Sequence, residues 1–325
     1  MTPAAAIPVF VVSVAVMLGA SAVFARRLDQ AGLRLGMPEA LLGLLTALAA
    51  DAPEIASAIT ALVEHQKAVA VGVVVGSNAF NLAAMLGLSA IVASRVRARH
   101  ETLELEAFVG IWLLGVCLAV VAGALGATVG LILVAVVIVP YVAVLAIGPG
   151  RIHSRFLAES FGEQHVREEA VDTRREIAGL VVTLLVAIAL IVGGSIGAVR
   201  SVTDLANAWS IPNALVGVVI LAVLTSLPNA WTGVRFGLQD RGSALMSETL
   251  NSNSINLVAG IAVPAALGAI GSLSGLDTFD IAWLVLMTVT ALVLFGRRGG
   301  AGTPAGVLMI GLYAVFLAVQ LVKLN

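Results

Sequence analysis

The chain has little charge. Only 11% of its 325 residues are Asp, Glu, Lys or Arg, whereas 60% are hydrophobic, and its mean hydropathy is +1.06. A soluble domain is nearer a quarter charged and half apolar, so it could not hide this much apolar surface from water. The composition therefore excludes a soluble globular protein and indicates an integral membrane protein whose surroundings are the lipid bilayer.

Cysteine, basic clusters and embedded histidine are scarce as well. Cys117 is the single cysteine, which excludes an internal disulfide and a cysteine-cluster metal site. No basic block suits nucleic acid, and all four histidines fall in loops or at the ends of apolar runs, which excludes a histidine proton relay. Without a serine–base pair or a nucleotide loop, we expect neither an enzyme nor a cofactor. The sequence indicates no obligatory protein partner.

Ten apolar runs are long enough to cross a bilayer, which takes about 20 residues. They cover residues 6–25, 38–63, 68–93, 105–125, 127–148, 177–199, 213–236, 243–271, 277–296 and 303–322. Positive residues follow the first run instead of preceding it, so we interpret this run as a retained span and not a signal peptide. The polar segment 149–176 separates five spans from five, which predicts two halves, 1–148 and 177–325.

The charges of the loops predict an orientation. With the N-terminus outside, 15 of the 18 Lys and Arg residues fall on the cytoplasmic side, the exceptions being Lys67, Arg200 and Lys323. This is the positive-inside pattern. We therefore expect both termini outside and the loop 149–176 in the cytoplasm, and the composition suits a prokaryotic plasma membrane. Five spans in each half predict an all-α fold of about ten transmembrane helices in two inverted five-helix repeats.

Two polar segments, each broken by a proline, interrupt the apolar runs. Asp51 and Glu54 flank Pro53 within the run 38–63, and Ser77 and Asn81 follow in the next run. A second copy with the same spacing follows 175 positions later: Pro228, Asn229, Ser252 and Asn256. Registered copies of this kind, here within 38–93 and 213–271, are the best sequence indication of a transporter's substrate site.

The first copy carries acids at membrane depth, where ionisable groups are costly and usually functional. Asp51 and Glu54 share a helix face, and Pro53 cannot donate a backbone hydrogen bond, which frees carbonyls near Ala49 and Ala50. Carboxylates and carbonyls are hard oxygen ligands that suit Na⁺ or Ca²⁺. The alternative is that the acids only pair with a neighbouring helix, for which Arg235 is the one basic residue near enough.

The second copy offers neutral oxygens. Its matching residues are Thr225, Ser226, Asn229, Ser252, Asn253 and Asn256. Hydroxyl and amide groups can coordinate cations or join helices, but the shared register favours one central site built from both copies. Glu248, four residues before Ser252, adds either a third carboxylate at the cytoplasmic mouth or an interfacial charge near Arg241.

These motifs resemble those of the sodium/calcium exchangers and the wider cation/calcium antiporters, whose inverted repeats read approximately G-T-S-x-P-E and G-S-N-x-x-N/D. AADAPE (49–54) and GSNAFN (76–81) look like the first repeat, and LTSLPN (224–229) and NSNSIN (251–256) look like the second. The resemblance implies ions bound between spans 2, 3, 7 and 8, with spans 1 and 6 sliding across the others to alternate access. It implies that Glu54 is a principal cation ligand. It also implies a set of helping oxygens: the carbonyls of Ala47 and Ala222 and the hydroxyls of Ser77 and Ser252.

The chain also departs from the family pattern. Asn229 and Asn256 stand where the second repeat usually has Glu and Asp, while Ala50 and Asp51 replace Thr and Ser in the first. The family resemblance favours Na⁺/Ca²⁺ exchange, and the two carboxylates of Asp51 and Glu54 still meet the charge that Ca²⁺ generally needs. The missing acids favour exchange of Na⁺ or another cation for H⁺, because one buried acid can hold either. A protein that keeps the fold without transporting is an alternative of another class.

Overall fold

The computed structural model describes residues 1–34, 37, 39–98, 100–147, 174–269, 278–297 and 299–322. The predicted cytoplasmic loop, 149–176, lies outside the described residues as far as residue 173. Within the described ranges the chain is helical almost throughout, and one short antiparallel pair joins β1 (Arg95–Val96) to β2 (Ala301–Gly302).

The first half of the chain forms helices of very different length. They are α1 (Pro3–Arg34), α2 (Glu39–Ala50), α3 (Ala52–Val63), α4 (Lys67–Asn81), the π-helical η1 (Leu82–Leu88), α5 (Ser89–Val92), α6 (His100–Val121) and α7 (Ala127–Ile147). The α4–η1–α5 segment runs without interruption and is buried along most of its length.

The second half repeats this order with one exception. It comprises α9 (Arg174–Ala208), α10 (Asn213–Leu215), η3 (Val216–Leu221), α11 (Ala222–Thr225), α12 (Leu227–Leu238), α13 (Gly242–Leu257), η4 (Val258–Ala262), α14 (Val263–Ala266), α15 (Thr278–Phe295) and α16 (Thr303–Val322). The exception is that α10, the π-helical η3 and α11 stand where the first half has the single helix α2. The π-helical η4 follows α13 as η1 follows α4, so even this irregularity recurs in the same place.

Six helices of the described chain are long and apolar enough to cross a membrane, and two bent pairs raise the number to eight. The pairs are Leu44–Ala50 with Ala52–Val63, bent by 54°, and Asn213–Thr225 with Leu227–Leu238, bent by 47°. The two other predicted spans correspond to α13 with η4 and α14, which is rich in Ser and Asn, and to α15, which is shorter. The all-α membrane fold of about ten spans is thus as predicted.

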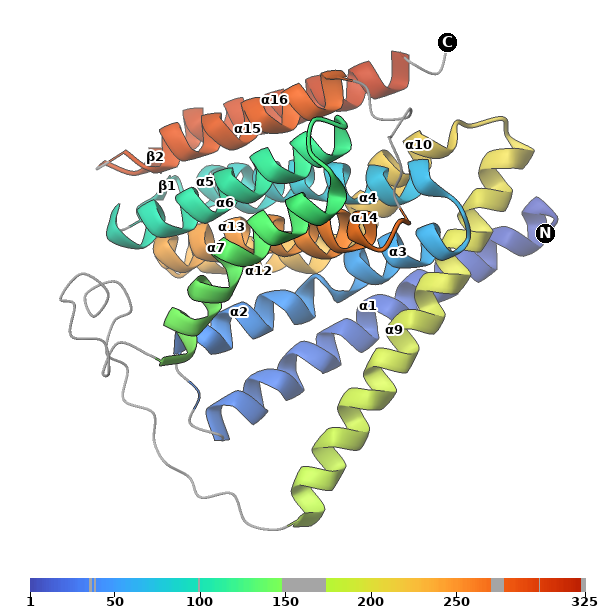
Figure 1. The fold of residues 1–325 in the computed structure, drawn as a ribbon, viewed down its shortest axis with the longest axis horizontal. Helices are drawn as coiled ribbons and strands as arrows, with labels where there is room; N and C mark the ends of the chain where they lie inside the picture. Colours follow the sequence, from blue (N-terminus) through green and yellow to red (C-terminus); the bar gives the residue numbers. More distant parts are fainter. Residues whose placement is uncertain are drawn as a thin grey trace.

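The helices α1 and α9 pack on each other and lie side by side along one edge of the molecule (Figure 1). Both are longer than the predicted spans 6–25 and 177–199, because polar and charged residues continue α1 beyond the C-terminal end of its apolar run and α9 beyond both ends of its run. Their outward side chains, such as Val12, Val182 and Leu185, are exposed. An exposed apolar face of this length suits contact with lipid.

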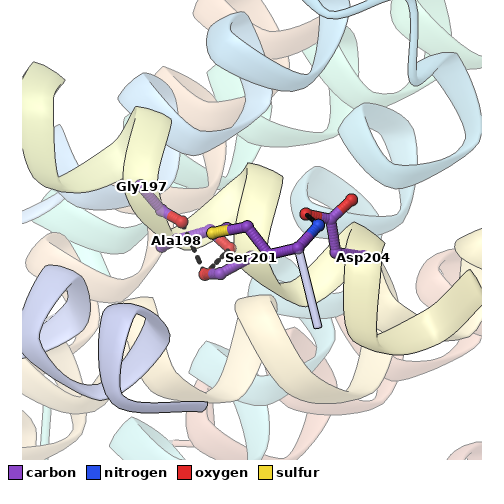
Figure 2. A network of polar contacts seen from close by, with 5 residues as sticks. Gly197, Ala198, Ser201 and Asp204 are labelled. Atoms are coloured by element: carbon purple, nitrogen blue, oxygen red, sulfur yellow. Dashed lines mark hydrogen bonds and ion pairs between the residues drawn. The ribbon is translucent and has the colours of Figure 1, made fainter. Parts of the chain in front are cut away.

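Ion pairs hold the ends of α1 and α9. The amino group of Met1 lies 2.7 Å from the Asp204 carboxylate, and the Arg200 guanidinium lies 2.6 Å from Glu64 at the end of α3. Figure 2 shows Asp204 one turn beyond Ser201, whose hydroxyl donates to the carbonyls of the preceding turn. These groups are partly exposed, so each pair adds little stability.

Small residues bring α4 against α10 and η3 at the centre of the molecule. A Cβ atom added to Gly76 would lie 2.5 Å from the carbonyl oxygen of Val218, and one added to Gly72 would lie 2.8 Å from that of Ala214. Only glycine allows two backbones to approach so closely, as is common between helices in membranes. This contact places the polar end of α4 beside the break between α11 and α12.

Candidate cation site

Two breaks in the helices position the site. Asp51 lies between α2 and α3, and Ser226 lies between α11 and α12. Pro53 and Pro228 occupy the second position of the helix that follows each break, where a missing N–H group is tolerated but the preceding helix cannot continue straight. The sequence therefore creates the breaks directly, in the same register in both halves.

The two acids are buried and lie close together. Asp51 is 0% exposed and Glu54 is 1% exposed. The amide nitrogen of Asn229 donates to Asp51 Oδ1 at 2.7 Å and to Glu54 Oε1 at 3.1 Å. One amide thus bridges both carboxylates, which concentrates two potential negative charges at one point inside the protein.

Residues of α13 complete the surroundings of the acids. The Ser252 hydroxyl donates to Asp51 Oδ1 at 2.6 Å, and the Asn256 amide donates to Glu54 Oε2. Asn81 donates to Ser252 Oγ at 3.0 Å. The predicted residues on α3, α4, α12 and α13 therefore meet in one buried cluster.

Reciprocal hydrogen bonds make the 175-residue register visible. Asn78 donates its amide to the carbonyl of Asn253 at 3.2 Å, and Asn253 donates to the carbonyl of Asn78 at 3.3 Å. The contact of Asn81 with Ser252 likewise has a counterpart, longer at 3.5 Å, between Asn256 and Ser77. The two copies face each other about an approximate two-fold axis, as inverted repeats should.

Several oxygens of the cluster lack a donor. Asp51 Oδ2, Asn81 Oδ1 and Asn229 Oδ1 are buried and have no hydrogen-bond partner in the described part of the chain. Leaving a buried acceptor unsatisfied costs about 1–3 kcal/mol. Three such oxygens in a cluster with two carboxylates form a set of ligands that suits a hard cation.

No basic side chain neutralises these acids. Within the described ranges, neither Asp51 nor Glu54 forms an ion pair, and Arg235 is exposed on α12. The alternative that Arg235 only balances these acids is therefore wrong. The reason is geometric: two turns beyond the break, the Arg235 side chain is directed outward instead of back toward the acids.

Other predicted residues lie behind the carboxylates. The carbonyls of Ala47 and Ala222 accept the backbone N–H groups of Asp51 and Ser226, at 2.9 and 3.1 Å. Thr225 donates its hydroxyl to the carbonyl of Leu221 at 2.8 Å. In this conformation these groups hold the breaks in shape, and Ser77, Ala50 and Ser226 are buried beside them.

One expectation needs correction. The carbonyl of Ala49, which Pro53 leaves without its usual helical donor, is not left bare, because the Ser21 hydroxyl of α1 donates to it at 2.9 Å. A neighbouring helix supplies the hydrogen bond that proline cannot. The freed carbonyl therefore joins α1 to the break.

Two further acids lie near the cluster. Glu248 is half-buried on α13, and Glu106 on α6 is 5% exposed. Sequence reasoning missed Glu106, although it is the single acid of the apolar run 105–125. Among the described residues, no group of three or more His, Cys, Asp or Glu side chains that could hold a metal ion is found; the central cluster itself contains two carboxylates and neutral oxygens.

Comparison with known proteins identifies the family. The model of the family described as sodium/calcium exchanger protein matches residues 5–147 and 179–322, two segments offset by about the same 175 residues as the motifs. Inner membrane protein YrbG of Escherichia coli is 26% identical over 298 residues, covering 87% of this chain and 86% of that protein. An uncharacterized membrane protein of Methanocaldococcus jannaschii, MJ0091, is 23% identical over 274 residues, covering 84% and 83%.

Solved structures have the same fold. The sodium-calcium exchanger NCX_Mj aligns with a TM-score of 0.66 at 17% identity, covering 98% of this chain and 99% of that one. Native YfkE aligns with a TM-score of 0.70 at 16% identity, covering 96% and 91%. The all-α fold with two repeats is confirmed. Because the family match extends over both halves, this chain belongs to the sodium/calcium exchanger family of membrane transporters.

Proposed function

We propose that the protein is a secondary active antiporter that exchanges Na⁺ for Ca²⁺ by alternating access, with Asp51 and Glu54 as its charged ligands. The observation that carries the proposal is the pair of buried carboxylates bridged by Asn229, without a basic partner in the described chain. Two negative charges balance one Ca²⁺ or two Na⁺. Because both ions need the same charges, they compete for the site, and this competition couples their movements.

The Asn229 side chain can change from a hydrogen-bond donor to a cation ligand when a cation binds. Its N–H group now faces the carboxylates while its Oδ1 has no partner. Rotation of the amide presents the oxygen to a cation in place of the N–H group. The proposed ligands, direct or supporting, are Asp51, Glu54, Ala47, Ala50, Ser77, Asn81, Ala222, Thr225, Ser226, Asn229, Ser252 and Asn256.

The pair α1 and α9 is the moving part in this proposal. These helices pack mainly on each other, and they contact the rest of the protein chiefly through α2 and α3. The polar contacts there include the bond from Ser21 to Ala49, the bond from Ser195 to Thr60 at 2.8 Å and the ion pair of Arg200 with Glu64. Few such polar contacts must rearrange when the pair slides. The same proposal includes the topology of the chain in a prokaryotic plasma membrane. Two halves, 1–148 and 177–325, are joined by the cytoplasmic loop 149–176, and both termini lie outside.

A second candidate is exchange of Na⁺ or another cation for H⁺. It is favoured by Asn229 and Asn256, which stand at two acidic positions of the family motif and donate N–H groups to the remaining acids. A site with fewer carboxylates suits ions of single charge. The two candidates share the site and differ only in the ion exchanged.

Sodium-gradient-driven uptake of radiolabelled Ca²⁺ into proteoliposomes tests the proposal, with Glu54→Gln beside the wild type. We expect uptake that needs the gradient and disappears in the variant. If the variant takes up Ca²⁺ as the wild type does, the proposal is wrong. If the wild type moves no Ca²⁺ but a pH gradient drives Na⁺ flux, the second candidate is correct. If neither flux occurs, the protein keeps the fold without transporting.

A further inference from the structure

A second polar cluster lies on the other side of α13. The Ser247 hydroxyl donates to Glu106 Oε1, the Asn251 amide donates to Ser247 Oγ at 3.3 Å, and the Tyr141 hydroxyl donates to Asn251 Oδ1 at 2.8 Å. The four residues come from α6, α7 and α13. Neighbouring residues of α13 thus serve different clusters, because Ser252 contacts Asp51 whereas Asn251 contacts Tyr141.

The hydrogen bonds of this cluster all run toward the carboxylate. Tyr141 donates to Asn251, Asn251 to Ser247, and Ser247 to Glu106. A chain of donors in one direction suits an acceptor that carries negative charge, since each bond polarises the next.

The second oxygen of Glu106 has no partner. Oε2 is buried, and it accepts no hydrogen bond within the described ranges. Glu106 is 5% exposed and forms no ion pair among the described residues. A charged carboxylate at this depth is costly unless a positive charge accompanies it. A proton on Oε1 would force the Ser247 hydroxyl to turn from Glu106 to another acceptor, and Oε2 would still lack a hydrogen-bond donor. A bound cation satisfies the oxygen and the charge together.

We infer that Glu106, Ser247, Asn251 and Tyr141 form a second cation site, which takes one hard monovalent cation such as Na⁺. Glu106 Oε2 supplies the charge, and the hydroxyl and amide oxygens retain lone pairs for neutral coordination. A single carboxylate balances a single positive charge, which disfavours Ca²⁺. Ser247 is half-buried, so the site is not sealed from its surroundings. The site is distinct from the pair of acids proposed for exchange.

Equilibrium binding of radiolabelled Na⁺ to the detergent-purified full chain tests this inference. The variant Asp51→Asn/Glu54→Gln removes both central carboxylates and leaves the second cluster intact. We expect this variant to bind one Na⁺ per chain, and addition of Glu106→Gln to abolish that binding. An equal concentration of Ca²⁺ should not displace the ion. No binding to the double variant, unchanged binding after Glu106→Gln, or displacement by equimolar Ca²⁺ would each overturn the inference.

Tyr141→Phe provides a gentler variant in the same double-variant background. It removes one hydroxyl oxygen and keeps the ring, so the fold is retained even if the triple variant fails to assemble. The loss of one neutral ligand, worth about 1 kcal/mol, should weaken Na⁺ binding about fivefold, and unchanged affinity would contradict the site. This assay measures binding without transport, so its outcome is independent of the uptake assay that tests the proposed exchange.

Discussion

Asp51→Asn should change the preference between Ca²⁺ and Na⁺ more than it changes the affinity for Na⁺. The substitution keeps the size of the side chain and an oxygen that can accept from Ser252, which lies 2.6 Å from Asp51 Oδ1. It removes one of the two charges that Asn229 bridges. The change in the site is therefore mainly electrostatic.

The magnitude follows from charge. At about 4 Å and an effective dielectric constant of about 20, two unit charges attract by about 4 kcal/mol. A bound Ca²⁺ then loses about 8 kcal/mol and a bound Na⁺ about 4 kcal/mol when the charge of Asp51 is removed. The substitution also removes the desolvation penalty of the buried Asp51 carboxylate. This penalty is the same whichever ion binds, so it cancels in the comparison.

The difference of about 4 kcal/mol corresponds to about a thousandfold change in the ratio of the two dissociation constants. If water in the site doubles the effective dielectric constant, the change is still about 30-fold. Calorimetric titration of the purified protein with each ion separately measures both constants, with choline holding the ionic strength.

Asp280→Asn is the matched control. Asp280 is also a buried acid, but it lies on α15 and accepts from Gln320 of α16, away from the central cluster. The control should leave the ratio of the two constants unchanged. If Asp51→Asn weakens both ions equally, or neither of them, the reasoning from two shared charges is refuted.

Three further substitutions have expected results. Asn229→Asp adds a third carboxylate and should raise Ca²⁺ affinity relative to Na⁺ by at least about tenfold in the same titrations; an unchanged ratio would place Asn229 away from the ion. Gly76→Ala brings a Cβ atom within 2.5 Å of a backbone oxygen, so thermal melting should show a loss of about 1–3 kcal/mol, whereas Gly115→Ala has nothing within 4 Å and should cost nothing. Ser21→Ala leaves the Ala49 carbonyl without its donor and should lower the stability by about 1–3 kcal/mol, and an unchanged melting temperature would contradict the role of this bond.

The sequence was sufficient to predict the centre of the molecule. Pro53 and Pro228 break their helices through local backbone chemistry, which a sequence reveals directly. The constant offset of 175 residues then predicts that both copies meet, as the reciprocal bonds of Asn78 and Asn253 show.

The features that were missed depend on contacts between distant helices. Nothing near Pro53 in sequence indicates that Ser21, on another helix, would satisfy the freed carbonyl. Glu106 stands near the start of its apolar run and resembles an interfacial charge, yet it is buried and bonded to Ser247 of α13. Packing between distant helices decides which polar residues are buried, and the hydrophobic periodicity of a single segment does not predict that packing.

The position of a bound divalent cation would show whether Asp51 and Glu54 together form the ion site. Crystals of the protein in strontium, a divalent cation with strong anomalous scattering, would locate the ion without assumptions about transport. We expect a single strong peak between the carboxylates of Asp51 and Glu54, and this peak should be lost in Glu54→Gln. A peak elsewhere, or one that persists at this position in the variant, would contradict this expectation.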